Sequence, residues 1–433
     1  MTETSRRPVT VVAVEMGYGH LRAARALADA LATDVLEADR PPLAGAEERA
    51  LWQRTRAAYE FVSRTSQLPV VGRPLRALLD GLTAIPHLYP RRDQSRPTAA
   101  VGGLERMVRR GLGDGLVGHL RRQNSTLLTT FYAPAVIAEL SDIERVVCVV
   151  TDTDLNRVWV PRHPEHTAIH YCAPTERAVR RLRAYGVPAA RIHLTGFPLP
   201  AELAGGDDLN TLRRNLAARL VRLDPAGAFR EQVGGELAHF FGALPREHEG
   251  EPPLVTFAVG GAGAQAELAD AFLPSLRRSL LERRLRLAMV AGTRPEIGLR
   301  FQRRVESAGL AERFGDGIEI LCESDFTRYY RRFNGLLERT DILWTKPSEL
   351  TFYAALGIPL VFSRPVGAHE RLNRRWAIQR GAGMKQDDPG CAADWLREWL
   401  LDGTLAAAAW SGYLRLPKFG TRRILDVVAA LEG

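Results

Sequence analysis

Lys346 and the residues after it have the chemistry of an anion site. Lys346 is one of only three lysines in a chain that otherwise uses arginine, and an ammonium on a flexible stem is a usual partner of a nucleotide phosphate. Pro347 ends the extended segment before it, and serine is a residue type that begins helices. Free N–H groups in a first helical turn bind anions, so the pattern predicts a phosphate site at Lys346, Ser348, Glu349, Leu350 and Thr351. The alternative is an ordinary capped helix with a solvated lysine.

A histidine and an aspartate are the candidates for acid–base chemistry. His20 ends a glycine turn that follows the apolar segment 9–14, and the ordinary pKa of an imidazole, about 6.5, suits the removal of a proton from a hydroxyl. Asp152 follows the apolar segment 145–150, at the strand end where open α/β sheets bind ligands. It is the rival base or a group that orients the molecule carrying that hydroxyl. Structural roles, a helix cap for His20 and a turn for Asp152, are the alternatives.

Two stretches of the chain alternate apolar strands with helical segments, and each opens with a strand that runs into a glycine loop. In the second stretch the strand 254–259 is followed by Gly260, Gly261 and Gly263, which would let backbone approach a diphosphate; a flexible turn is the alternative. The dinucleotide-binding fingerprint is incomplete in the first stretch, because Arg22 stands where its third glycine belongs. The pattern predicts an α/β protein with two Rossmann-like domains that face across a cleft.

The segment 51–125 interrupts this alternation with helical, aromatic and basic stretches. It holds thirteen arginines against five acidic residues, in a chain with a net charge of +9. Cations mixed with apolar groups are typical of a surface that lies on anionic lipid. A helical insertion with a solvated arginine face is the alternative. Nucleic acid is disfavoured, because no recognised binding motif accompanies the charge.

Composition bounds the class of protein. A chain of 433 residues is long enough for two or three domains, and it contains no apolar run of the roughly 20 residues that span a membrane. We see no secretory signal in the polar first residues. The four cysteines, Cys148, Cys172, Cys322 and Cys391, lack paired spacing, which indicates free thiols in a reducing cytoplasm and no zinc site.

Several short motifs together resemble the family of monogalactosyldiacylglycerol synthases and processive diacylglycerol glucosyltransferases, which is related to the peptidoglycan N-acetylglucosaminyltransferase. The resemblance spans residues 9–384 and depends on the order of the motifs more than on any one. They are Gly17-Tyr18-Gly19-His20, Val150-Thr151-Asp152 with Trp159, Thr195-Gly196-Phe197-Pro198, Gly260-Gly261-Ala262-Gly263, Thr345-Lys346-Pro347 and 367–373, which includes Glu370 and Asn373.

The resemblance implies a GT-B glycosyltransferase that is inverting and independent of metals and cofactors. It implies that the donor is a nucleotide diphosphate sugar, with a UDP-sugar as the leading candidate. The sugar would be transferred to a lipid or other hydroxyl acceptor at the cytoplasmic membrane face. His20 would be the base. The acceptor would contact Gly17, Tyr18, Gly19, Asn156 and Trp159, and the donor sugar Glu370 and Asn373. For that last pair, an exposed helix start is the alternative.

The expected domains are 1–200, a helical connector 201–252, 253–403, and a C-terminal segment 404–433 whose last helix crosses back to the first domain.

The chain departs from this family at three places. Asn156 replaces a histidine after the Thr-Asp motif, and Ser348-Glu349 replaces flexible glycines after the lysine. Phe352 stands where an acid grips the nucleotide ribose, and Glu349 is its candidate substitute. These departures leave two alternatives open: a nucleotide-sugar 2-epimerase, which needs no acceptor, and a non-catalytic relative that binds nucleotide or lipid.

Overall fold

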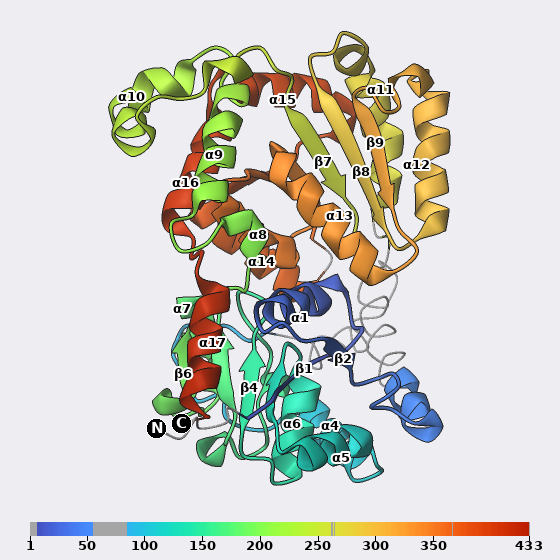
Figure 1. Cartoon of the computed structure of the whole chain (residues 1–433), viewed down its shortest axis with the longest axis vertical. Coiled ribbons are helices and arrows are strands. Elements are labelled where there is room, and N and C mark those ends of the chain that lie inside the picture. Colours follow the sequence, from blue (N-terminus) through green and yellow to red (C-terminus); the bar gives the residue numbers. More distant parts are fainter. Residues whose placement is uncertain (1–6, 55–84, 261–262, 264, 366, 433) are drawn as a thin grey trace. The chain divides into compact units, whose positions relative to one another are not determined.

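The computed structural model describes residues 7–54, 85–260, 263, 265–365 and 367–432. Within them the chain divides into two compact units (Figure 1). Unit 1 comprises residues 1–199, 366–372 and 417–433, and unit 2 comprises 200–365 and 373–416. Residues 55–84 of the basic segment 51–125 lie outside the described part.

Unit 1 is built on a six-stranded parallel sheet with the strand order β2-β1-β3-β4-β5-β6. Its strands are β1 (Val9–Ala13), β2 (Val35–Glu37), β3 (Thr126–Thr129), β4 (Val146–Val149), β5 (His170–Ala173) and β6 (Ile192–Leu194). Its helices are α1 (Tyr18–Ala30), α4 (Ala99–Val108), α5 (Asp114–Gln123), α6 (Tyr132–Leu140), α7 (Glu176–Ala184) and α17 (Gly420–Ala430), with the short 3-10 turns η1 (Arg157–Trp159), η2 (Pro164–His166) and η3 (Ala189–Arg191). Every residue of β3 and β4 is buried, as expected for strands covered on both faces.

Unit 2 repeats this plan with the order β12-β11-β10-β7-β8-β9, which is the full Rossmann arrangement. Its strands are β7 (Leu254–Ala258), β8 (Arg286–Gly292), β9 (Ile318–Cys322), β10 (Ile342–Thr345), β11 (Leu360–Phe362) and β12 (Gly383–Lys385). Its helices are α8 (Ala201–Ala204), α9 (Asn210–Arg222), α10 (Ala228–Phe241), α11 (Ala269–Leu281), α12 (Pro295–Ser307), α13 (Phe326–Arg339), α15 (Ala392–Leu401) and α16 (Thr404–Arg415). The 3-10 helix that matters below is η7 (Glu349–Leu356).

The order of strands places a topological switch point in each sheet. In unit 1 the chain leaves β1 for β2 on one side and returns to β3 on the other; in unit 2, β7 has β8 on one side and β10 on the other. Loops that leave neighbouring strands in opposite directions open a crevice at the carboxyl ends of the strands. Each unit therefore has one preferred place for a ligand.

The helices that were expected as a connector, α8 to α10, group with unit 2. Two arginines hold α9 to the rest of unit 2: Arg219 donates to the carbonyl oxygens of Thr340 (2.7 Å) and Leu356 (3.0 Å), and Arg222 forms an ion pair with Asp341 at 2.8 Å. Burial lowers the pKa of Arg219 to about 10. These side chains fix the start of β10, the strand that ends at the predicted anion site.

The C-terminal segment divides between the units, because α16 groups with unit 2 and α17 with unit 1. The hydroxyl of Thr421 in α17 donates to the carbonyl oxygen of Leu199 at 2.8 Å. A Cβ at Gly420 would lie 2.0 Å from the carbonyl oxygen of Phe197, so only glycine lets α17 begin so close to this backbone. Figure 1 shows α17 beside the strands of unit 1.

Among the described residues, no helix combines the length and the apolar character that crossing a bilayer would require.

Candidate functional site

His20 lies at the switch point of unit 1. The expected turn 17–20 is shorter than predicted, because α1 already begins at Tyr18 and Gly17 alone, with φ of 134°, precedes it. Tyr18, Gly19 and His20 therefore form the first turn of α1. Nδ1 of His20 lies 2.8 Å from the carbonyl oxygen of Thr130, which directly follows β3, and the hydroxyl of Thr130 donates to the carbonyl oxygen of His20 at 2.9 Å.

These contacts define the tautomer of His20. A carbonyl oxygen only accepts hydrogen bonds, so Nδ1 carries the proton and donates it to Thr130. In the neutral ring the lone pair is then on Nε2. The hydroxyl oxygen of Thr151, after β4, lies 3.1 Å from the same Nδ1 and is a second acceptor for it. Two groups at neighbouring strand ends thus orient the imidazole with Nε2 as its basic nitrogen.

Aromatic side chains surround this histidine. The ring of Phe131 meets it edge to face with centroids 4.8 Å apart, and Trp159 lies at 6.2 Å. Tyr132 packs against Phe131 at 4.4 Å and against Trp159 at 5.5 Å. Trp159 is buried, and its carbonyl oxygen accepts a bond from Tyr171 at 3.0 Å. The structure thus brings Trp159 and His20, both candidates from the sequence, into one cluster.

The other polar candidates of unit 1 follow β4. Asp152 is half-buried next to Thr151. The nearby Asp154 is fully buried and binds Arg177 at 2.6 Å and Arg181 at 2.8 Å, so it is structural. Asn156 precedes η1, and its side-chain oxygen is buried without a hydrogen-bond donor among the described residues. That oxygen would be satisfied by a water or a bound hydroxyl.

Lys346 lies at the switch point of unit 2, and its side chain crosses Gly260. A Cβ at Gly260 would lie 2.3 Å from Cε and 3.0 Å from Nζ of Lys346. Gly260 follows β7 and Lys346 follows the adjacent β10, where Thr345 pairs with Ala258. The missing side chain of Gly260 therefore makes room for the ammonium above the end of β7.

Gly263, the other described residue of the glycine loop, bonds back to Gly260. The N–H of Gly263 donates to the carbonyl oxygen of Gly260 at 2.7 Å, and Gly263 has φ of 68°, in the left-handed region. Gly261 lies outside the described residues. Gln265 then links this loop to the end of β11, because it donates to the carbonyl oxygen of Arg364 at 2.5 Å and accepts from the hydroxyl of Ser363.

The predicted helix start after Lys346 differs from expectation. Ser348 precedes η7, but its side chain makes no capping bond, and η7 is a 3-10 helix. The N–H of Thr351 donates to the carbonyl oxygen of Ser348 at 3.0 Å, so the prediction that this N–H is open to an anion is wrong. The side chains of Leu350 and Thr351 are buried, whereas Ser348 and Glu349 are partly exposed. Of the predicted phosphate site, the structure thus favours the ammonium of Lys346 over the N–H groups that follow Ser348.

Glu370 and Asn373 lie in α14 (Ala368–Gln379), which passes from unit 1 to unit 2. Both are buried, so the alternative of an exposed helix start is wrong. The amide nitrogen of Asn373 donates to the carbonyl oxygen of Pro347 at 3.2 Å. Asn373 therefore fixes the backbone next to Lys346. Phe352, at the position of the ribose acid, is also buried and packs against Trp376 at 5.4 Å.

Thr130, Thr151, Phe131 and Tyr132 were missed by the sequence reasoning. The first two act through a carbonyl oxygen and a hydroxyl, and the others through ring contacts. Each follows a buried strand, and Thr151 also lies in the Val150-Thr151-Asp152 motif, which gave it no role of its own. In unit 2 Ser363, which directly follows β11, was missed in the same way.

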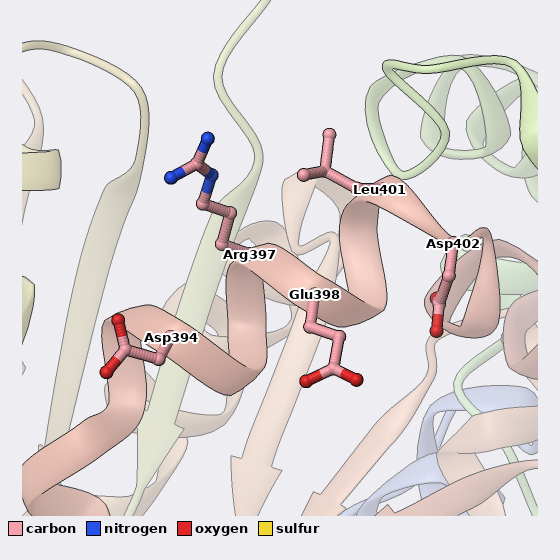
Figure 2. Close-up of a pocket in the computed structure, with 5 residues that line it drawn as sticks. All are labelled: Asp394, Arg397, Glu398, Leu401 and Asp402. Carbon is pink, nitrogen blue, oxygen red and sulfur yellow. The ribbon is translucent and has the colours of Figure 1, made fainter.

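A hollow elsewhere on unit 2 is a weaker candidate. A shallow depression along α15 is lined by Asp394, Arg397, Glu398, Leu401 and Asp402, and Figure 2 shows these five side chains. The labelled side chains come from one helix and its end, and they point in different directions. A binding site needs a few convergent polar groups, so we place no site here. In the described part of the chain no cluster of three or more His, Cys, Asp or Glu side chains is arranged to hold a metal.

Comparisons with known proteins address the fold. A family model described as a domain of unknown function (DUF6938) matches residues 299–386, and a search of curated sequences gives no match. The UDP-GlcNAc 2-epimerase from Neisseria meningitidis, solved with UDP-GlcNAc bound, superposes with a TM-score of 0.52 at 11% identity, over 98% of this chain and 100% of that one. MurG from Acinetobacter baumannii superposes with a TM-score of 0.47 at 14% identity, over 98% of this chain and 99% of that one.

The fold prediction is confirmed: the chain is an α/β protein with two Rossmann-like parallel sheets of the GT-B type. The narrower resemblance to the lipid glycosyltransferases stays a prediction.

Proposed function

We propose that this chain is an inverting glycosyltransferase that moves a sugar from a nucleoside diphosphate donor to a hydroxyl acceptor. The observation that carries the proposal is the orientation of His20. Its Nδ1–H donates to the carbonyl oxygen of Thr130 at 2.8 Å, which leaves Nε2 as a proton acceptor at a sheet switch point.

The chemical step follows from this tautomer. Nε2 of His20 takes the proton of the acceptor hydroxyl while the hydroxyl oxygen forms a bond to the anomeric carbon. The bond from that carbon to the diphosphate oxygen breaks, and the diphosphate leaves with the electron pair. One-step attack from the opposite face inverts the anomeric configuration. A positioned base of this kind contributes about 10²- to 10⁴-fold.

Lys346 is assigned to the leaving group. Its ammonium lies over Gly260, which follows β7 and has no side chain to separate the charge from the backbone. Charge that develops on a diphosphate is stabilised by a fixed cation, and the gain is greatest in a site that excludes water. This residue would serve in place of the metal ion that other transferases use.

For the acceptor we propose a membrane lipid. Tyr89 is 59% exposed and precedes the exposed Arg91 and Arg92. Buried cations fix this segment to unit 1: Arg181 donates to the carbonyl oxygen of Pro86 at 2.5 Å, and Arg157 donates to that of Ser95 at 2.6 Å. An aromatic ring and guanidinium groups held outward suit an anionic lipid surface. The enzyme would then act as a peripheral protein at the cytoplasmic face.

The test is turnover of a panel of UDP-, GDP- and TDP-sugars by the full chain, with anionic vesicles that contain hydroxyl lipids. We expect release of one nucleoside diphosphate and a glycosylated lipid of inverted configuration. Folded protein that neither binds nor turns over any of these sugars would overturn the proposal.

The same panel without acceptor tests the epimerase alternative, since the epimerase from Neisseria meningitidis has this fold. A 2-epimerised sugar among the products would replace our proposal.

A further inference from the structure

A cavity of about 270 Å³ lies in unit 1 at the amino ends of β3 and β4. Ser125 lines it and directly precedes β3, and Arg145 lines it and directly precedes β4. Thr130 and Thr151, which contact the ring of His20, follow the same two strands. The cavity is therefore at the edge of the sheet opposite His20, and it takes no part in the function proposed above.

Two turns form the cavity, and two arginines join these turns by reciprocal bonds. Arg121 of α5 donates to the carbonyl oxygen of Ser141, the residue after α6, at 2.8 Å. Arg145, in the turn after α6, donates to Oδ1 of Asn124, the residue after α5, at 2.6 Å. Asn124 and Asp142 have φ of 47° and 57°, so each turn contains a left-handed residue. Because the crossed bonds hold both turns, the cavity is already formed without a ligand.

The charged groups around the cavity are not paired with one another. Arg121, Arg145, Asp142 and Glu144 all line it, and within the described residues no ion pair joins any two of the four. Nε of Arg145 is buried and has no acceptor in the part of the chain that the structure describes. Each guanidinium has five N–H donors, so both arginines keep unused donors. One small cavity thus combines two cations and two anions that have capacity for a ligand.

We infer that this cavity binds a small zwitterion, a molecule that carries a phosphate or carboxylate group and an ammonium group. A guanidinium donates strong hydrogen bonds to anionic oxygens, and the carboxylates of Asp142 and Glu144 accept from an ammonium. A simple anion would be repelled by these carboxylates, and a simple cation by the two arginines. A zwitterion meets both pairs of charges with the opposite sign. None of these four residues was a candidate from the sequence.

The experiment is isothermal titration calorimetry of the full chain with phosphoethanolamine, and with inorganic phosphate and ethanolamine as its two halves. The variants are Arg145→Gln and Glu144→Gln. Arg122→Gln is the matched control, because Arg122 is an exposed arginine of α5 that does not line the cavity. Circular dichroism melting establishes that each variant is folded.

The unmodified chain should bind phosphoethanolamine saturably, and more tightly than either half. For Arg145→Gln we expect a Kd about tenfold higher, as for the loss of a hydrogen bond between charged groups. For Glu144→Gln we expect a Kd about threefold higher, the usual value of an exposed ion pair. With phosphate alone the sign should reverse for Glu144→Gln, because the variant removes a repulsion. A structural role of Glu144 would not produce this reversal.

Vesicles that contain phosphatidylethanolamine then distinguish the two sources of this chemistry. Vesicles that compete with phosphoethanolamine assign the site to a lipid headgroup, and vesicles that do not compete assign it to the free molecule. In both cases the cavity binds the zwitterion.

The inference is overturned if phosphoethanolamine does not bind saturably, or if phosphate alone binds as tightly. It is also overturned if Arg122→Gln weakens binding as much as Arg145→Gln does. Should Arg145→Gln fail to fold, the exposed Glu144 still decides the question, and an unchanged Kd in Glu144→Gln would contradict the inference. No nucleotide enters this experiment, so its outcome is independent of the proposed function.

Discussion

The two switch points of this chain have the same topology and opposite chemistry. In unit 1 the strand ends present an oriented imidazole, two threonines and aromatic rings around His20. In unit 2 the corresponding place presents a glycine turn crossed by Lys346. Both are crevices of the kind that a parallel sheet makes at its carboxyl edge. The sheet therefore supplies the position, and the residues directly after the strands determine the chemistry.

This difference indicates a division of labour. An oriented neutral base suits removal of a proton from a hydroxyl, whereas a cation over bare backbone suits a phosphate. Substitutions at the first site should change the chemical step, and those at the second should change the affinity for nucleotide. The predictions below test this separation, in decreasing order of effect.

Replacement of the base should have the largest effect. His20→Ala removes the group that accepts the proton, so kcat for transfer should fall by about 10²- to 10⁴-fold. Initial rates at saturating donor and acceptor measure it. His163→Ala is the control, because His163 is 71% exposed in its side chain and should keep full activity. Equal rates for His20→Ala and the unmodified chain would remove His20 from the chemistry.

Replacement of the cation should come next. Lys346→Met keeps the length of the side chain and removes its charge, so kcat/KM for the donor should fall about a hundredfold, as when a donor to a developing anion is lost. The exposed Lys385 provides the control Lys385→Met. If both lysine variants behave alike, the ammonium over Gly260 does not bind the donor.

Gly260→Ala should displace that same ammonium without removing it. The added Cβ would lie 2.3 Å from Cε of Lys346, which the flexible lysine relieves by moving. We expect a fall in donor affinity of roughly tenfold, smaller than for Lys346→Met and without loss of folding. Calorimetry with the preferred diphosphate measures it. Gly235→Ala in α10, where a Cβ has open space, should bind normally; normal binding by Gly260→Ala as well would contradict the geometry.

Thr151→Val should disturb only the orientation of His20. It removes the hydroxyl that lies 3.1 Å from Nδ1 and keeps the shape, so kcat should fall roughly fivefold, the usual value of one neutral hydrogen bond. Donor affinity should not change. Thr151→Ser retains the hydroxyl and should recover the rate; a serine variant as slow as valine would show that the hydroxyl is not what matters.

The smallest effect on activity is expected away from both switch points, at a histidine pair that should affect acid stability instead. Nδ1 of His170 lies 2.9 Å from Nε2 of His193, and Arg191 contacts His170. Burial, and then the charge of Arg191, lowers the pKa of His170 to about 4 and also lowers the pKa of His193. Both lie below the unfolded value near 6.5, so between these values the unfolded chain binds more protons.

Stability should therefore be complete above about pH 6.5 and decrease as the pH falls toward about 4. Urea unfolding at several pH values measures this slope. His170→Gln should flatten it, and His20→Ala should leave it as it is. A slope that is unchanged in His170→Gln would contradict the assignment.

The strands and their ends were predictable because parallel strands are continuous apolar runs, and glycines or hydroxyl residues follow them. The apolar runs alone were enough to place His20, Gly260 and Lys346 after the ends of strands. They could not reveal Thr130 and Thr151, which contact His20 across 110 and 131 residues. A backbone carbonyl acceptor has no signature in the sequence.

Where prediction failed, the surrounding structure outweighed local preference. Ser348 is a favoured helix cap, yet its N–H turns back to the carbonyl oxygen of Lys346 at 2.8 Å and a 3-10 helix follows. For Glu370 and Asn373 an exposed helix start was the alternative to a contact with the donor sugar, and both are buried. Propensity describes an isolated segment, and packing of α14 against its neighbours decided these positions.

The central claim is that the switch point of unit 1 performs the chemical step and that of unit 2 binds the nucleotide. The most direct test measures both kcat and the Kd for the preferred nucleoside diphosphate in His20→Ala and Lys346→Met. The account predicts that His20→Ala binds the diphosphate like the unmodified chain while its turnover collapses, and that Lys346→Met binds it far more weakly. Equal losses of diphosphate affinity in the two variants would contradict it.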